Sequence, residues 1–252
     1  MTERVIVFDV FRFDPEKDPG PRRQKYEVTL EENMSVLDGL RQIQEKRDGF
    51  LAFRASCNRG ACGACAMRID GRIQLACETR GETLRPGVVR IDPLPNLAVI
   101  KDLMVDMGPF WAAYDRIRPW LSPRVDYVDR ERLQTPKDRA KIDEYIGCVL
   151  CGACYAACPA VRRTPQYVGP AALAKAYRFA SDSRDMDAAE KLAALDDHAG
   201  VWGCDTTFRC VRVCPKGVPP THAVTAMRRR LVARAFGRVA GWFRRGRRRS
   251  AS

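Results

Sequence analysis

The sequence predicts an α+β protein in two parts, a strand-rich N-terminal part and a helical C-terminal part. Strand-forming residues in alternating patterns occur in the first hundred residues, whereas helix-forming residues dominate after residue 136. The eleven cysteines also form two groups, at positions 57–77 and 148–214, with none between them. The expected division is a first domain at 1–100, a packed linker at 101–135, a helical domain at 136–243 and a basic tail at 244–252.

The first domain begins with the signals of a hairpin followed by a helix. Residues 5–13 are rich in β-branched and aromatic side chains, and residues 25–30 alternate polar with apolar ones, so the two segments predict a pair of strands. Ser35 has the chemistry of a helix N-cap, and apolar residues at helical spacing follow it to about residue 47.

Four cysteines then follow with the spacing Cys-x4-Cys-x2-Cys and a distant fourth member. This spacing is typical of plant-type ferredoxins, which hold a 2Fe-2S cluster. Glycine and alanine between the cysteines let the backbone approach sulfide and aim its N–H groups at sulfur. The alternative is a flexible loop with free thiols. The predicted ligands are Cys57, Cys62, Cys65 and Cys77.

Two further hairpin strands are expected around Asp70-Gly71, and residues 88–91 predict the last strand of the domain. Strand, strand, helix, cysteine loop and three more strands resemble a β-grasp 2Fe-2S ferredoxin domain.

The C-terminal part contains one cysteine block written twice. Each block spans ten positions from its first to its last cysteine and is followed by proline, but the second has Thr207 where the first has its second cysteine. In chains with two such blocks, the cysteine before each proline ligates the cluster of the other block. This rule assigns a 4Fe-4S cluster to Cys148, Cys151, Cys154 and Cys214, and a 3Fe-4S cluster to Cys158, Cys204 and Cys210.

Two other uses of these cysteines are structural zinc and disulfides. Zinc usually takes two separated Cys-x-x-Cys pairs, which the threefold steps fit poorly. Disulfides need an oxidising compartment, and the N-terminus has no pattern of an export signal.

The remaining segments predict helices and one connecting stretch. Residues 97–107 have helical apolar spacing, with Gly108-Pro109 expected to end the helix. The stretch from there to residue 135 is rich in proline and aromatic residues and predicts a packed linker: Trp111, Tyr114, Trp120 and Tyr127. Further helices are expected at 137–147, 170–180 and 186–195, the last capped by Ser183 or Asp185.

The net charge of +13 is concentrated in one place. From Lys216 to Ser252 there are ten arginines, one lysine and no acidic residue, which accounts for +11. Apolar residues recur there every three or four positions, which predicts an amphipathic basic helix: Val224, Met227, Leu231, Ala235, Phe236, Val239, Trp242 and Phe243. Such a helix either lies at anionic lipid headgroups or packs on its own domain. No run approaches the roughly 18 apolar residues of a membrane span.

The order of these motifs resembles the iron-sulfur subunit of succinate dehydrogenase and fumarate reductase. Shorter stretches agree with it: Ser56-Cys57, Cys62-Gly63, the run from Gly152 to Pro159, Gly169-Pro-Ala-Ala172, Ser183-Arg-Asp185 and Cys214-Pro-Lys-Gly217. The resemblance implies an electron-transfer subunit that relays single electrons between the FAD of a flavoprotein subunit and a quinone at a membrane anchor, which in some members carries haem. It also implies a peripheral position on the cytoplasmic face of the inner membrane, and no dicarboxylate site or catalytic residue in this chain.

The family places quinone beside the three-iron cluster. The matching positions here are Pro159, Ala160, Arg163, Asp205, Thr207 and Arg228. Ubiquinone-using members typically have tryptophan at the position of Arg163 and histidine at that of Asp205, so the resemblance favours menaquinone. The competing interpretation is that all six are ordinary surface residues with no role in quinone binding.

Two other functions stay open at this point. Similar chains serve thiol:fumarate reductases and other flavoenzymes, whose electron partner is not a membrane quinone. A zinc-stabilised nucleic-acid binder would explain the basic tail, but only +2 of the charge lies in the first 215 residues, so we expect no nucleic-acid partner.

Overall fold

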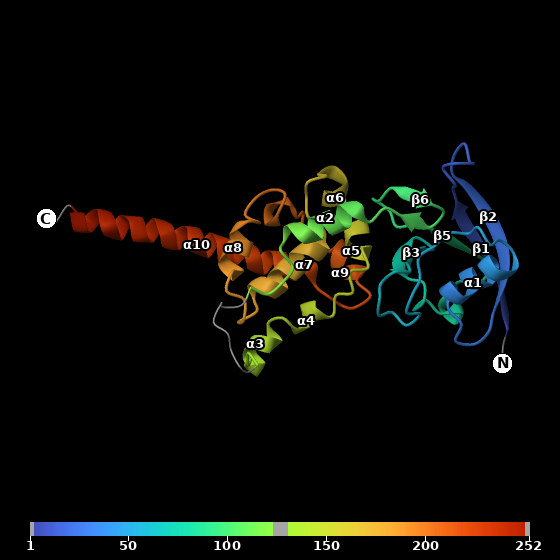
Figure 1. Cartoon of the computed structure of the whole chain (residues 1–252), viewed down its shortest axis with the longest axis horizontal. Helices are drawn as coiled ribbons and strands as arrows, with labels where there is room; N and C mark the ends of the chain where they lie inside the picture. The colour runs from blue at the N-terminus through green and yellow to red at the C-terminus, as the bar shows by residue number, and fades with distance from the viewer. Residues whose placement is uncertain (1–2, 123–130, 250–252) are drawn as a thin grey trace.

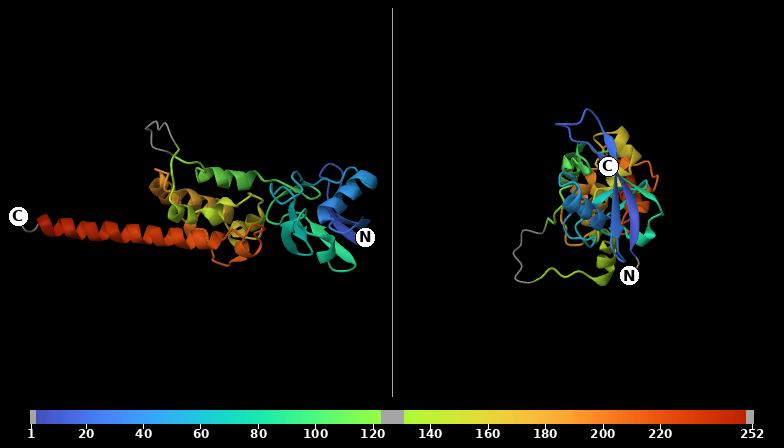
Figure 2. Two further views of the ribbon diagram at one scale, coloured as in Figure 1. Left: turned by 90° about the horizontal axis from the view of Figure 1, so that it is seen from below. Right: turned by 90° about the vertical axis from the view of Figure 1, so that its right-hand side faces the viewer.

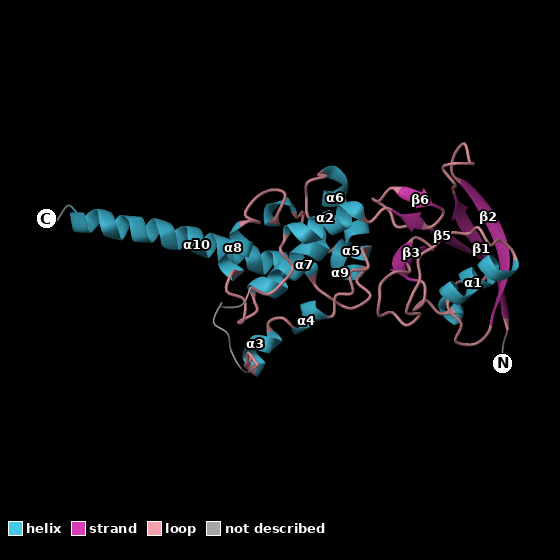
Figure 3. Ribbon diagram, in the orientation of Figure 1, coloured by secondary structure: helices cyan, strands magenta, loops and turns pink. Residues whose placement is uncertain are grey.

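The computed structural model describes residues 3–122 and 131–249, with side chains up to residue 237. The described chain is elongated, with the strands at one end, most helices in the middle and the C-terminal helix projecting from the other end (Figure 1, Figure 2). Figure 3 shows the strands together with one helix at one end of the molecule, and the remaining helices in the middle and at the other end. The α+β class and the order of its two parts are therefore as predicted.

The N-terminal part contains a five-stranded mixed sheet in the order β2-β1-β5-β3-β4. The first two strands form the predicted antiparallel hairpin, and β5 runs parallel to β1 in the centre of the sheet. The strands are β1 (Arg4–Arg12), β2 (Arg22–Leu30), β3 (Ala66–Ile69), β4 (Arg72–Leu75) and β5 (Val88–Asp92). All five strands were expected from the sequence.

Helix α1 (Val36–Lys46) packs its apolar face on this sheet. Ser35 caps it as predicted, because its hydroxyl accepts from the Asp38 N–H while the Asp38 carboxylate accepts from the Ser35 N–H. Gly39 lies where the helix meets the ring of Phe8, and a Cβ there would fall 2.6 Å from that ring. The glycine thus brings helix and sheet close together, at the cost of some helix propensity. A 3-10 turn, η1 (Gly81–Thr83), precedes β5.

The prediction of a helix at residues 97–107 is wrong. The segment forms a second, two-stranded sheet of β6 (Val99–Lys101) and β7 (Met104–Val105), joined at Asp102 with φ of 47°. A helix would expose the Asp102 side chain, but here it is buried and accepts hydrogen bonds from the main-chain N–H of Phe13 and Ala52. The predicted boundary at residue 100 consequently falls inside this hairpin.

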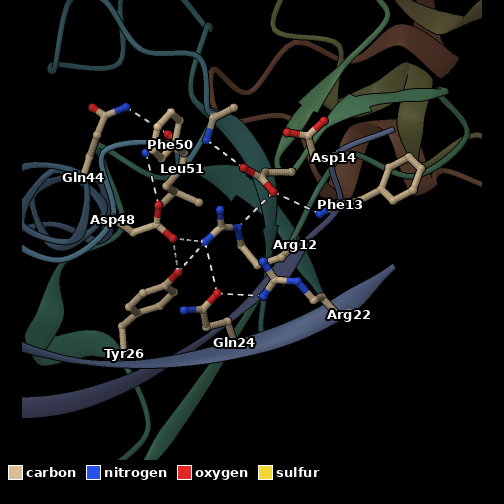
Figure 4. Close-up of polar contacts among 12 residues, drawn as sticks. Arg12, Phe13, Asp14, Arg22, Gln24, Tyr26, Gln44, Asp48, Phe50 and Leu51 are labelled. Atoms are coloured by element: carbon tan, nitrogen blue, oxygen red, sulfur yellow. Dashed lines mark hydrogen bonds and ion pairs between the residues drawn. The ribbon is translucent and has the colours of Figure 1, made fainter. Parts of the chain in front are cut away.

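Asp102 belongs to a buried polar network around Arg12. The Arg12 Nε donates to Asp102 at 2.9 Å, and its Nη1 contacts Asp48, Tyr26 and Gln24 (Figure 4). Burial would lower the pKa of Arg12, but its hydrogen bonds to Asp48 and Asp102 outweigh burial and raise it. Burial and the hydrogen bond to Asp48 raise the pKa of Tyr26 to about 12. The arginine therefore stays charged and ties the hairpin to the sheet.

Gly108-Pro109 begins a helix, where the sequence predicted the end of one. The helix is α2 (Gly108–Arg116), with proline in its first turn, where no backbone N–H is needed. Phe110 of this helix is buried and meets the ring of Tyr155 edge to face at 5.6 Å. In the predicted linker Trp111 and Trp120 are exposed, Tyr114 is half-buried, and Tyr127 lies outside the described residues.

The helical part differs from expectation in two details. The single helix predicted at 137–147 is two short ones, and the helix expected at 186–195 is shorter and starts after Asp187, which makes no side-chain cap. Asp185 is instead buried in an ion pair with Lys191. The elements are α3 (Pro136–Ala140), α4 (Asp143–Ile146), α5 (Ala153–Ala156), α6 (Pro159–Arg163), α7 (Gly169–Ala180), α8 (Ala188–Ala193), η2 (Val201–Gly203) and α9 (Arg209–Arg212).

The last helix, α10 (Pro220–Arg249), has two different environments. Val224, Met227 and Leu231 are buried in the helical part, so the start of the predicted apolar stripe is core. Beyond them the helix leaves the body (Figure 1), and Phe236 is 71% exposed. No helix among the described residues is both long and apolar enough to cross a bilayer.

Replacing Asp102 by asparagine tests the role of the Arg12 network in joining hairpin to sheet. We expect Asp102→Asn to lower the free energy of unfolding by about 1.5–3 kcal/mol, because the buried Arg12 charge keeps Asp48 but loses its other carboxylate partner. Asp115→Asn, at an exposed position of α2, should change it by less than about 0.5 kcal/mol. Denaturant unfolding of the two variants prepared together measures the difference, and equal effects would contradict the assigned role.

Candidate metal centres

The first cysteine loop lies between α1 and β3 and points its main chain at sulfur. The Cys57 sulfur accepts from the N–H groups of Ala61 and Cys62, both at 3.2 Å. The Gly60 N–H, with φ of 66°, donates to the Cys77 sulfur at 3.2 Å. The loop therefore joins three of the four predicted 2Fe-2S ligands through backbone hydrogen bonds.

The same loop creates different environments for its thiols. Hydrogen bonds from the Arg59 and Cys62 N–H groups lower the pKa of Cys57 to about 6. Burial raises the pKa of Cys65 to about 12. A half-buried thiolate stabilised by amides and a buried thiol beside Cys77 form a donor set that suits iron, since the metal supplies the positive charge that a buried thiolate lacks.

The two C-terminal blocks have the same backbone conformation. Leu150 and Gly152, at the second and fourth positions after Cys148, have positive φ angles of 53° and 81°. Thr206 and Phe208, at the same positions after Cys204, have φ angles of 57° and 58°. In each block a one-turn helix follows, α5 or α9, and then Cys-Pro. The repeat visible in the sequence is thus a repeated loop structure, which Phe208 adopts although it is not glycine.

The blocks exchange their last cysteines in space. One hollow is lined by Cys148, Cys151 and Cys154 of the first block and by Cys214 of the second. A second hollow is lined by Cys204 and Cys210 of the second block and by Cys158 of the first, together with Thr207. The structure therefore brings together the residues of both predicted ligand sets.

Burial dominates the electrostatics of both hollows. It raises the pKa of Cys151 to about 11 and that of Cys154 well above the ordinary value of a thiol. Burial likewise raises the pKa of Cys148, Cys158 and Cys210. Such thiols ionise readily only when a metal binds them, so the donor chemistry suits iron-sulfur clusters. Among the described residues, no group of three or more Cys, His, Asp or Glu side chains has the arrangement that would hold a single metal ion.

The first cysteine loop packs directly on the first C-terminal block. A Cβ on Gly63 would fall 2.8 Å from the Cα of Cys151, so only glycine fits between the two loops. Lys216 donates from Nζ to Glu78 at 2.8 Å, and this is the one ion pair between residues 4–105 and residues 136–237, the ranges whose side chains the structure describes. The Asn96 side chain adds a 2.7 Å hydrogen bond to the carbonyl of Ala156. Two predicted cluster sites are thus held next to each other.

The six predicted quinone positions are partly gathered at the second hollow. Pro159, Asp205 and Thr207 line it, whereas Ala160 is buried in α6. Arg163 is bound to the Asp205 carboxylate at 2.6 Å and 2.7 Å.

Arg228 lies beside the same loop. Its Nε and Nη2 donate to the carbonyls of Val201 and Cys204, at 2.9 Å and 2.7 Å, and the guanidinium lies over the Trp202 ring. These contacts hold the loop that carries Cys204.

Sequence patterns missed two buried hydroxyl groups at the second hollow. The Thr221 hydroxyl lies 3.2 Å from the Cys210 sulfur. Tyr167 lines the hollow, and burial raises its pKa, with the neighbouring thiols of Cys204 and Cys158 raising it further. Neither residue lies in a cysteine block, so no spacing could indicate it.

Comparison with known proteins adds independent information. Residues 7–112 match the model of a 2Fe-2S iron-sulfur cluster binding domain, and residues 144–218 match that of a 4Fe-4S dicluster domain. The chain is 41% identical over 223 residues to a fumarate reductase iron-sulfur subunit of Mycobacterium tuberculosis, covering 87% of this chain and 90% of the relative.

Solved structures agree. A chain of the Mycobacterium smegmatis Sdh1 complex in the apo form superposes with a TM-score of 0.84 at 26% identity, over 93% of this chain and 98% of the other. A hypothetical protein from Helicobacter pylori, 17% identical with a TM-score of 0.55 over 89% of this chain and 39% of its own, shares the fold alone. With two matching cluster domains and a 41% identical relative that is matched over 90% of its length, this chain belongs to the family of iron-sulfur electron-transfer subunits of succinate dehydrogenases and fumarate reductases.

Proposed function

We propose that this chain relays single electrons between the FAD of a flavoprotein subunit and a membrane quinone through one 2Fe-2S, one 4Fe-4S and one 3Fe-4S cluster. When bound, the clusters supply one-electron redox centres. The observation that carries the proposal is the exchange of Cys158 and Cys214 between the two C-terminal hollows. A chain that only stored metal would not need three neighbouring sites in a row.

The proposed ligands are the eleven cysteines, four for the first cluster, four for the second and three for the third. Thr207 supports the three-iron assignment, since it occupies the position of a fourth thiolate and lines the hollow beside Cys204. A hydroxyl is a much weaker ligand for iron than a thiolate, so this corner of the cubane is the one that would lack its metal.

Exchanging one cysteine at a time tests the proposed ligands. We expect Cys214→Ala to remove the four-iron cluster and leave the three-iron cluster, although Cys214 belongs to the second block. Cys158→Ala should do the reverse. Iron analysis should fall by about four and about three atoms per chain respectively, and electron paramagnetic resonance (EPR) should show which signal is lost.

Thr207→Ala is the matched control and should retain both signals, because Thr207 is not a proposed ligand. If Cys214→Ala instead abolished the three-iron signal and Cys158→Ala the four-iron signal, each block would hold its own cluster and the proposed exchange would be wrong.

The quinone is proposed to bind at the second hollow, near Pro159 and Thr207. The Arg163–Asp205 ion pair stands at this hollow in place of the tryptophan and histidine typical of ubiquinone-using members. This replacement of both positions favours menaquinone. A thiol:fumarate reductase relay is the alternative, and a complex that purifies without a membrane anchor would support it.

Turnover of the purified complex with two quinone classes tests this choice. We expect kcat/KM for a naphthoquinone to exceed that for a benzoquinone by about tenfold, which corresponds to roughly 1.4 kcal/mol of differential transition-state stabilisation. Turnover with a dye that accepts electrons at the flavoprotein serves as the control, and its rate should be the same in the complex samples used for the two quinone assays. A preference for the benzoquinone would overturn the menaquinone assignment.

We further propose that the end of α10 lies on the cytoplasmic membrane surface, beside an anchor subunit. Residues 244–249 contain five arginines on the part of the helix that projects from the body (Figure 2). Each cation near an anionic bilayer contributes about 1 kcal/mol to binding. Phe236 supports this position, because a large exposed apolar side chain on a basic helix favours an interface.

Neutralising these five arginines tests the lipid contact. We expect their replacement by glutamine to weaken binding of the full chain to vesicles containing phosphatidylglycerol by at least about tenfold, while replacement by lysine preserves it, because charge drives the contact. Vesicles of phosphatidylcholine alone should bind all forms weakly. Unchanged binding of the glutamine variant in a sedimentation assay would exclude the lipid role.

A further inference from the structure

Tyr167 is placed in the wall of the second hollow by close packing. It lies between α6 and α7, is 1% exposed and is among the largest fully buried side chains of the described chain. Its ring packs on Gly203, where a Cβ would fall 2.8 Å from the ring carbon Cδ2. Gly203 immediately precedes Cys204, so the absence of a side chain there lets the tyrosine reach the cysteine loop.

The hydroxyl of Tyr167 has no hydrogen-bond partner. It is one of three buried side-chain polar atoms without a partner in the described part of the chain, the others being Arg68 Nε and Ser181 Oγ. A buried hydroxyl that gives up water without gaining a partner destabilises a fold, so such a group in a native protein calls for an acceptor.

The surroundings of this hydroxyl indicate the acceptor. Tyr167 lines the same hollow as Cys158, Cys204 and Cys210, and these thiols are the ionisable groups that act on it electrostatically. Among these thiols Cys204 acts most strongly on the Tyr167 hydroxyl, whereas Cys210 already meets the Thr221 hydroxyl at 3.2 Å. The Cys204 sulfur is therefore the acceptor expected for the unpartnered Tyr167 hydroxyl.

We propose that Tyr167 donates a hydrogen bond to sulfur of the cluster held by Cys158, Cys204 and Cys210, at the corner formed by Cys204. This role rests on the proposed function, which assigns that cluster. A hydrogen bond to cluster sulfur stabilises the reduced form, because reduction adds negative charge to the sulfur atoms. Tyr167 therefore raises the reduction potential of the centre nearest the quinone and favours arrival of the electron there. It is a positioning and tuning residue, with no covalent step of its own.

Tyr167→Phe in the purified complex tests this role, because it removes one oxygen atom and keeps the ring on Gly203. Redox titration followed by EPR should show the equilibrium constant for reduction of the three-iron centre falling about tenfold, which is 59 mV for a one-electron couple. The potentials of the other two centres should not move. Tyr145→Phe removes a hydroxyl from another buried tyrosine, one that packs against Tyr177 outside this hollow, and should leave the three-iron potential unchanged.

If the equilibrium constant for reduction of the three-iron centre in Tyr167→Phe stayed within a factor of two of the parent value, the inference would be overturned while the proposed function stayed intact. If the variant lost the centre, the unmodified complex would decide: after exchange into D2O, electron-nuclear double resonance should detect a deuteron coupled to the oxidised centre, and its absence would overturn the inference. A parent complex with no three-iron signal would refute the cluster assignment instead, and the same titration of whatever centre occupied that hollow would still test Tyr167.

Discussion

Burial of thiol groups around two hollows is the constraint on which the rest of the helical part depends. Cys148 and Cys214 come from different blocks yet line one hollow, so neither block can be complete without the other. Thiols buried in this way ionise only when a metal compensates them, and metal binding therefore contributes directly to folding. Short helices of four or five residues, such as α5 and α9, would be unstable alone and are held by this arrangement.

The same requirement explains why the two parts of the chain meet where they do. Gly63 of the first cysteine loop touches Cys151 of the next, and Lys216, two residues after Cys214, reaches back to Glu78, the neighbour of Cys77. An electron relay needs consecutive centres at short separation, and these contacts join cysteine loops rather than distant surfaces. Arg12 and Asp102 perform the supporting task of fixing the hairpin that leads from one part to the other.

Local chemistry determined which features the sequence could predict. Ser35 and its capping box, the Asp70-Gly71 turn and the cysteine spacings all depend on residues a few positions apart, and each pattern led to the observed element or group of residues. The failures came from long-range contacts. Residues 97–107 have helical spacing, but Asp102 is bound by Arg12, ninety positions earlier, and the turn follows from that contact. Tyr167 and Thr221 line a hollow that is defined by the cysteines of the two blocks. Neither lies within a block, so the cysteine spacing could not indicate them.

Locating iron in the intact complex tests the central claim most directly. Anaerobically prepared complex, crystallised and measured at the iron absorption edge, should give three separate anomalous peaks in this chain, with one between Cys148 and Cys214 and one between Cys158 and Cys204. About nine iron atoms per chain should account for them. Zinc at any of the three positions, or a single peak bounded by one block alone, would contradict the account.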